Sequence, residues 1–127
     1  MKETIVLLDR NDIIINILKK HFPNYKFYHD RTLDKALSHA TVKDISLIII
    51  MQDSYDETGG FLCQQFRMHD INVPIVLLTS SQDDYDAVIT YELGADDYIV
   101  LPINERVLVA RLKANIRRAH CCKVKKV

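Results

Sequence analysis

Apolar residues recur along the chain in five short runs, spaced about twenty residues apart, with longer segments of helical periodicity between them. Each run is short enough for a strand. The first, third and fourth runs do not alternate with polar residues, as expected for strands covered on both faces. The pattern therefore predicts an α/β fold with a five-stranded parallel, doubly wound sheet. The predicted strands are Thr4–Leu8, Lys26–Tyr28, Leu47–Met51, Pro74–Thr79 and Tyr98–Val100.

Helix signals fill the intervals between these runs. Ile13, Ile14, Ile17 and Leu18 form one apolar stripe, and Thr32 is a candidate N-cap for the next helix. The later helices are marked by glycine, proline and apolar spacing. These signals are Gly59-Gly60 at the start of the third helix, Gly94 after the fourth, and Pro102 before a last helix containing Leu108, Leu112 and Ile116.

Composition narrows the functional classes. The 127 residues carry 17 basic and 17 acidic side chains and are 48% hydrophobic, which suits one folded domain and excludes intrinsic disorder. Zero net charge argues against nucleic-acid binding through a general positive field. The apolar start, Thr4–Leu8, is too short for a signal peptide and no long apolar run follows, so we expect a cytoplasmic protein without a membrane partner.

The cysteines predict neither disulfides nor a metal site. Cys63, Cys121 and Cys122 cannot pair completely, and Cys121 and Cys122 are adjacent in a polar tail. His120 joins them in the only Cys/His cluster, and adjacent residues rarely converge on one metal ion. We therefore expect no metal and no cofactor.

In a parallel doubly wound sheet, the functional crevice lies at the carboxyl ends of the central strands. The segments at these ends are Asp9–Asp12, Met51–Asp53, Thr79–Ser81 and Leu101-Pro102. Function should therefore depend on what these four segments can do together.

The C-terminal half, from VPIVLLTS through GADDY (Gly94–Tyr98) to the basic last helix, resembles the receiver domains of bacterial response regulators. The resemblance runs from Ile5 to Arg118 and is strongest to the winged-helix (OmpR/PhoB-type) transcription regulators. It implies a (βα)5 flavodoxin/CheY-like receiver fold over residues 1–118. Residues 119–127 would then be the start of an interdomain linker.

The resemblance also implies a set of site residues. In that family two acids after the first strand hold Mg²⁺, and an Asp ending the third strand accepts a phosphoryl group. A Thr or Ser ends the fourth strand, and a Lys precedes the Pro after the fifth. Asp9 and Thr79 match this pattern, whereas Arg10, Met51 and Leu101 occupy the second acid, acceptor and Lys positions.

Two counts place Met51 at the acceptor position. Met51 lies eight positions before Gly59, as the family's GxxxCxxLR pattern requires, and it also ends the strand Ser46–Met51 that matches DLILLD. A thioether cannot accept a phosphoryl group. The alternative acceptor, Asp53, would lie one pleat beyond the pocket if the strand continues.

The altered residues predict a different kind of pocket. Met51 and Leu101 should fill the former acidic site with apolar volume. Arg10 should pair with Asp9, Asp12 or Asp53. Tyr98, at the family's switch aromatic, should be held in one orientation because no phosphorylation remains to move it.

A dimer interface is implied by the OmpR/PhoB-type subfamily, whose receivers associate through their fourth helix, fifth strand and fifth helix. Asp97 with Arg111, and Asp96 with Lys113, match positions of ion pairs between subunits. The apolar part of this predicted interface consists of Val88, Tyr91 and Val109.

These observations predict an atypical receiver that works without aspartyl phosphorylation and is not an enzyme. We expect it to be the N-terminal regulatory and dimerisation domain of a two-component transcription regulator, binding DNA through a C-terminal winged-helix domain outside this chain. Three alternatives stay open: a stand-alone receiver acting by protein contact, a receiver phosphorylated at Asp53, and a small-molecule sensor that uses the altered crevice.

Overall fold

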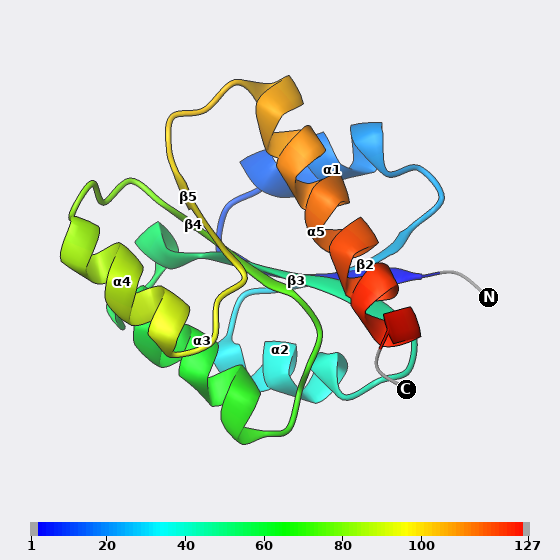
Figure 1. Cartoon of the computed structure of the whole chain (residues 1–127). Helices are drawn as coiled ribbons and strands as arrows, with labels where there is room; N and C mark the ends of the chain where they lie inside the picture. The colour runs from blue at the N-terminus through cyan, green and yellow to red at the C-terminus, as the bar shows by residue number, and fades with distance from the viewer. Residues whose placement is uncertain (1–2, 126–127) are drawn as a thin grey trace.

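The computed structural model describes residues 3–125, with side chains described as far as His120. Strands and helices alternate along the chain, as the apolar pattern predicts (Figure 1). The elements are β1 (Thr4–Leu8), α1 (Ile13–His21), β2 (Lys26–Asp30), α2 (Leu33–Ala40), β3 (Ile45–Met51), a 3-10 turn η1 (Gln52–Ser54), α3 (Gly59–Met68), β4 (Ile75–Thr79), α4 (Asp84–Glu92), β5 (Asp97–Val100) and α5 (Glu105–Lys125).

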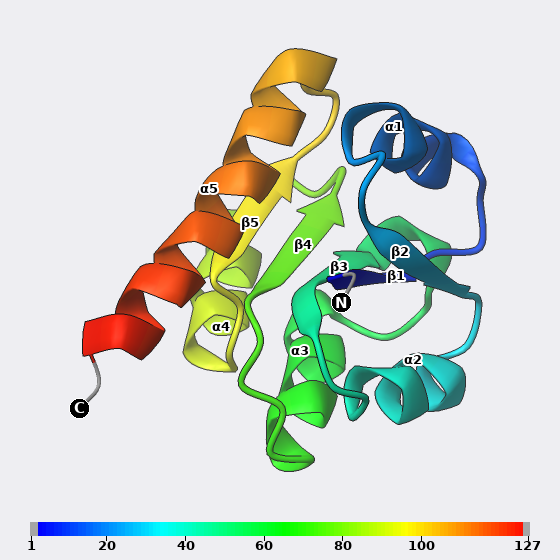
Figure 2. The ribbon, with the colours of Figure 1, turned by 90° about the vertical axis from the view of Figure 1, so that its right-hand side faces the viewer.

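All strand pairs are parallel, and the strand order is β2-β1-β3-β4-β5. Helices α1 and α5 cover one face of the sheet, and α2, α3 and α4 cover the other (Figure 2). The strand side chains pack into two apolar layers, because successive residues point to opposite faces. This three-layer arrangement confirms the predicted doubly wound parallel sheet.

Local sequence signals explain several element boundaries. The Thr32 side chain accepts a hydrogen bond from the Lys35 N–H, which confirms the predicted N-cap of α2. Gly94 follows α4 with φ +127°, a conformation that favours glycine over residues with a side chain. At Gly59 a Cβ atom would collide with a Leu77 methyl group, so glycine lets α3 pack closely on β4.

The C-terminal segment is more regular than the sequence suggests. Helix α5 continues beyond Arg118 as far as Lys125, so the predicted linker at 119–127 begins as helix. The domain boundary at residue 118 stays a prediction. The side chains of Cys121 and Cys122 lie outside the described residues.

Burial also bears on the candidate chemistry of Cys63. Its side chain lies in the core under α3, and burial raises the pKa of the thiol to about 12. The thiol is therefore protonated at neutral pH, and Cys63 is a core residue, not a nucleophile.

Within the described part of the chain, no group of three or more His, Cys, Asp or Glu residues is placed to hold a metal ion. Nor does any helix in residues 3–125 combine the length and apolar character required to cross a bilayer.

Candidate functional site at the carboxyl edge of the sheet

Asp9 follows β1 and lies at the centre of the crevice, with only 1% of its surface exposed. Its Oδ1 atom accepts hydrogen bonds from the Ser54 hydroxyl at 2.9 Å and from the Asn11 N–H at 3.0 Å. Its Oδ2 atom is buried and has no hydrogen-bond partner. The sequence did not predict the role of Ser54. Its hydroxyl partly offsets the cost of burying the Asp9 carboxylate, because it donates a hydrogen bond to it.

Arg10 forms no ion pair with Asp9, Asp12 or Asp53, so the predicted pairing is wrong. Its guanidinium lies over the Tyr55 ring, 4.9 Å from the ring centre, and Arg31 takes Asp12 as its ion-pair partner at 3.3 Å. The Arg10 main chain is held between the Ser54 hydroxyl and the Arg31 side chain. The exposed Arg10 side chain thus stacks on an aromatic face and leaves Asp9 without an ionic partner.

Met51 and Leu101 are half-buried and pack against the same apolar layer, on the α1/α5 side of the sheet. The Leu101 N–H donates to the Thr79 carbonyl at 2.8 Å, which fixes Leu101 beside the end of β4. Because β1 and β3 pair Leu8 with Ile50, the next residues along the strands, Asp9 and Met51, are neighbours. Apolar side chains thus take up the space next to the central carboxylate.

Asp53 does not lie one pleat beyond the pocket, because β3 does not continue. The chain turns into η1 at Gln52 and brings the Asp53 side chain over the end of β4. There the carboxylate accepts the Ser80 N–H at 3.1 Å to each oxygen, and the Thr79 hydroxyl lies 3.2 Å from its Oδ1 atom. The same hydroxyl lies 2.8 Å from the Gln52 side-chain oxygen, a contact that the sequence did not suggest.

Tyr98 points inward from β5 and is buried. Its main-chain N–H donates to the Tyr91 hydroxyl at 3.0 Å, and the two rings are 6.3 Å apart. Burial raises the pKa of the Tyr98 phenol. Tyr98 and Ser81 line the same small cavity, so the aromatic residue at the predicted switch position lies near the loop after β4.

The predicted interface residues separate into two groups. Val88 is 52% exposed and Tyr91 is also exposed, so both are available for contact. Val109 is only 6% exposed and packs in the α1/α5 core layer, so its assignment to the interface is wrong. Helical periodicity explains the difference, because Val107 lies two positions earlier on α5 and presents the exposed valine instead.

The predicted ion pairs also differ. Arg111 binds Asp97 within the same chain, at 2.5 Å, and the Asn115 amide donates to the same carboxylate at 3.1 Å. Asp96 binds Arg67 at 2.8 Å, whereas the Lys113 ammonium lies over the Phe22 ring. Asp96, Asp97 and Arg111 therefore already have ion-pair partners within the protomer, and these partners come from different elements of the fold.

Replacing Met51 by Asp should lower the free energy of unfolding by about 1–3 kcal/mol. The new carboxylate would enter an apolar layer beside Asp9, whose Oδ2 atom already lacks a partner. Met51→Leu keeps the apolar volume and should cost less than about 1.5 kcal/mol. Urea denaturation of both variants tests this account, and a Met51→Asp variant as stable as the parent would contradict it.

The architecture is that of a CheY-like signalling domain. The sequence matches the response regulator receiver domain over residues 5–113. The chain therefore belongs to the response regulator receiver domain family.

The curated relatives include transcription regulators. The chain is 31% identical over 123 residues to the alkaline phosphatase synthesis transcriptional regulatory protein PhoP of Bacillus subtilis, covering 94% of this chain and 50% of that protein. It is 44% identical over 85 residues to the transcriptional regulatory protein GltR of Pseudomonas aeruginosa, covering 65% of this chain and 35% of that protein. The chain thus spans half or less of the length of these relatives.

Solved structures show the same fold. The signal receiver domain of a putative LuxO repressor protein from Vibrio parahaemolyticus superposes with a TM-score of 0.84 at 19% identity, covering 100% of this chain and 99% of that one. A two-component response regulator from Clostridium difficile gives a TM-score of 0.79 at 24% identity, covering 93% and 98%. At these identities the likeness concerns the fold alone.

Proposed function

We propose that this chain is an atypical receiver domain that regulates transcription without aspartyl phosphorylation. It would act as the N-terminal regulatory and dimerisation domain of a cytoplasmic winged-helix DNA-binding protein. The observation that carries the proposal is the occupancy of the phosphoryl-binding region by the chain's own side chains. Met51 and Leu101 place apolar groups at the acceptor and Lys positions, and the Asp53 carboxylate accepts hydrogen bonds from the Thr79 hydroxyl and the Ser80 N–H.

Asp53 has a specific role in this proposal. The family's Thr hydroxyl at the end of the fourth strand holds a phosphoryl oxygen, and here the corresponding Thr79 faces a carboxylate. Asp53 thus supplies a permanent negative group to the loop after β4, where phosphorylation would supply a temporary one. Because its carboxylate accepts the Ser80 N–H and contacts the Thr79 hydroxyl, Asp53 holds the start of this loop. A receiver held in this way acts only if its active arrangement is already populated.

Acetyl phosphate with Mg²⁺ should leave the intact mass of this protein unchanged, because no carboxylate stands at the end of β3 and Asp9 alone is a poor Mg²⁺ site. A second candidate, phosphorylation at Asp53, is favoured by the exposure of Asp53 and its contact with Thr79. Asp53→Asn is the matched control. A gain of one phosphoryl group in the parent that disappears in Asp53→Asn would overturn the first candidate and support the second.

Binding to DNA is proposed for a further domain, and the relatives support it. Both are named transcriptional regulatory proteins, and this chain covers half or less of each. The coding sequence downstream of Val127 tests this part of the proposal. A winged-helix domain there would support it, whereas a stop codon would favour a stand-alone receiver that acts by protein contact.

Association through α4, β5 and α5 is the proposed means of regulation. The sheet ends at β5, which α4 and α5 flank on opposite faces. Val88 and Tyr91 on α4 and Val107 on α5 expose apolar surface next to this edge. Apolar contacts of this kind set affinity, whereas exposed charges set orientation.

A further inference from the structure

A recess opens between the end of α1 and the C-terminal half of α5, with a volume of about 500 Å³. It lies near the amino-terminal edge of the sheet, where β2 begins, and therefore at the opposite end from Asp9 and Asp53. None of its lining residues belongs to the crevice or to the proposed dimer surface, except that Lys113 was first assigned to the latter. The volume is within the range of sites that hold small organic molecules.

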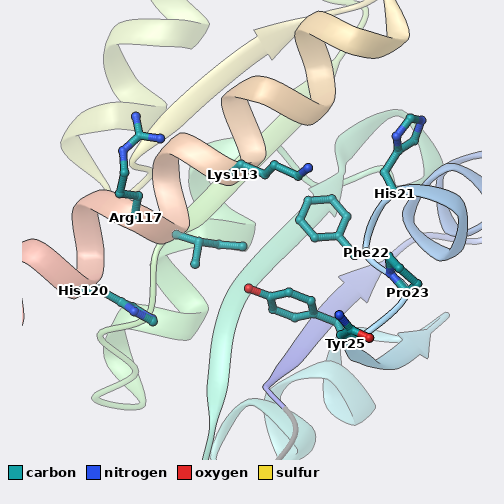
Figure 3. Close-up of a pocket in the computed structure, with 9 residues that line it drawn as sticks. His21, Phe22, Pro23, Tyr25, Lys113, Arg117 and His120 are labelled. Carbon is teal, nitrogen blue, oxygen red and sulfur yellow. The ribbon is translucent and has the colours of Figure 1, made fainter.

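The floor of the recess is apolar and partly aromatic. Phe22 and Ile116 are buried, and the Tyr25 ring meets the Phe22 ring edge to face, with 5.4 Å between the ring centres. Figure 3 shows the Phe22 and Tyr25 rings next to each other beneath α5, with the Tyr25 hydroxyl directed toward that helix. Burial, with a smaller contribution from Glu3, raises the pKa of this phenol, so the hydroxyl stays neutral and can donate a hydrogen bond.

The rim of the recess is cationic. The Lys113 ammonium lies 5.6 Å from the centre of the Phe22 ring, and Arg117 follows one turn later on α5. Figure 3 shows the Lys113 side chain extending over the Phe22 ring. Neither side chain has a carboxylate within ion-pair distance among the residues whose side chains are described. By contrast, the two histidines of the rim, His21 and His120, bind Glu105 and Glu3.

The Lys113 ammonium contacts only an aromatic ring face, and such a contact is weak. Replacing it by a contact with an anion therefore costs little free energy. An anionic group would draw the Lys113 ammonium toward itself, form a charge-assisted hydrogen bond and uncover the face of the Phe22 ring. That face would then be free to receive another flat ring. The apolar floor and the cationic rim together fit a molecule that has a flat aromatic ring and a negatively charged group at one end.

We propose that the recess between α1 and α5 binds a small aromatic carboxylate. The ring would lie against Phe22 and Tyr25, and the carboxylate would contact Lys113. This site goes beyond the proposed function and is independent of it, because no residue of the carboxyl-edge crevice takes part. Binding here would act on α5, the helix that also carries Arg111 and Val107, so occupancy could reach the proposed dimer surface through one rigid element.

The test uses 2-naphthoate as the probe and the ¹⁵N-labelled 127-residue chain as the target. Titration should shift the amide signals of His21, Phe22, Asn24 and Tyr25 and of residues 113–120, with saturation that gives one Kd. The neutral analogue 2-naphthamide has the same rings without the charge and should bind about tenfold more weakly. Equal Kd values for the two probes, or shifts confined to other parts of the chain, would overturn the proposal.

Variants separate the site from general charge effects. Lys113→Gln removes the ammonium from an exposed position and should weaken 2-naphthoate binding about tenfold, whereas Lys113→Arg should retain it. Lys35→Gln is the matched control, because Lys35 is an exposed lysine on α2, across the sheet from the recess. The proposal fails if Lys113→Gln and Lys35→Gln bind the probe equally well.

Discussion

Replacing Arg111 by methionine should lower the free energy of unfolding by about 2–3 kcal/mol. Asp97 is 8% exposed, and Arg111 is its charged partner, with Asn115 as a further donor. Methionine keeps much of the arginine's apolar stem but leaves the buried carboxylate without its cation. The estimate lies below the full cost of breaking a buried pair, because the Arg111 side chain itself is 40% exposed. Urea denaturation at neutral pH and low protein concentration measures the change.

Two further variants make this measurement specific. Arg106→Met makes the same substitution on the same helix, at an exposed arginine that forms no ion pair among the described side chains, and should change stability by less than about 0.5 kcal/mol. Asp97→Asn combined with Arg111→Met removes the buried charge and should recover part of the loss. If Arg111→Met were no less stable than Arg106→Met, the pair would not support the fold.

Replacing Val88 by aspartate should weaken self-association by at least about tenfold, or ~1.4 kcal/mol. The substitution puts a charge into the apolar surface that Val88, Tyr91 and Val107 expose beside β5, and a second copy would have to bury it. Because Val88 is exposed in the protomer, the variant should fold as well as the parent. Sedimentation equilibrium at micromolar concentration measures the effect.

Val42→Asp is the matched control for this experiment. Val42 is 47% exposed, close to the exposure of Val88, but lies between α2 and β3, and β4 separates β3 from β5 in the sheet. It should leave association unchanged. A parent protein that is monomeric throughout, or a Val88→Asp variant that associates as the parent does, would show that this surface is not an interface. Arg111 is a poor choice for this test, because its substitution also disturbs Asp97 within the protomer.

The fold followed from local pattern to a large extent. Apolar runs without alternation predicted strands buried on both faces, and β1, β3 and β4 are buried along almost their whole length. Thr32 and Gly94 marked helix ends correctly, because capping and left-handed backbone depend on the residue itself. The C-terminal boundary did not follow from composition, because polar residues after Arg118 suggested a linker but α5 continues to Lys125. An exposed helix face and a linker are both rich in polar residues, so composition alone does not distinguish them.

The site was predictable only in its outline. The sequence placed Asp9, Met51, Thr79 and Leu101 at strand ends, and parallel strands bring such ends to one edge. It did not predict that the chain turns at Gln52, because a strand and a 3-10 turn differ there by a few backbone angles that the neighbouring packing selects. That turn decides whether Asp53 lies outside the crevice or over Thr79.

Side-chain partners were the least predictable feature, for a physical reason. A charged side chain at the surface has several partners of similar energy, and distances between elements decide among them. Arg10 thus stacks on Tyr55, and Lys113 lies over Phe22, although the sequence predicted a carboxylate partner for each. By itself, the sequence determined the layers of this protein, the edge at which its candidate site lies and the presence of a thioether, Met51, at the end of the third strand, since these depend on residue type and period. Only the tertiary structure decided which carboxylate meets Thr79, which valine faces solvent and where Arg111 finds its partner, because each of these depends on how separate elements are placed in space.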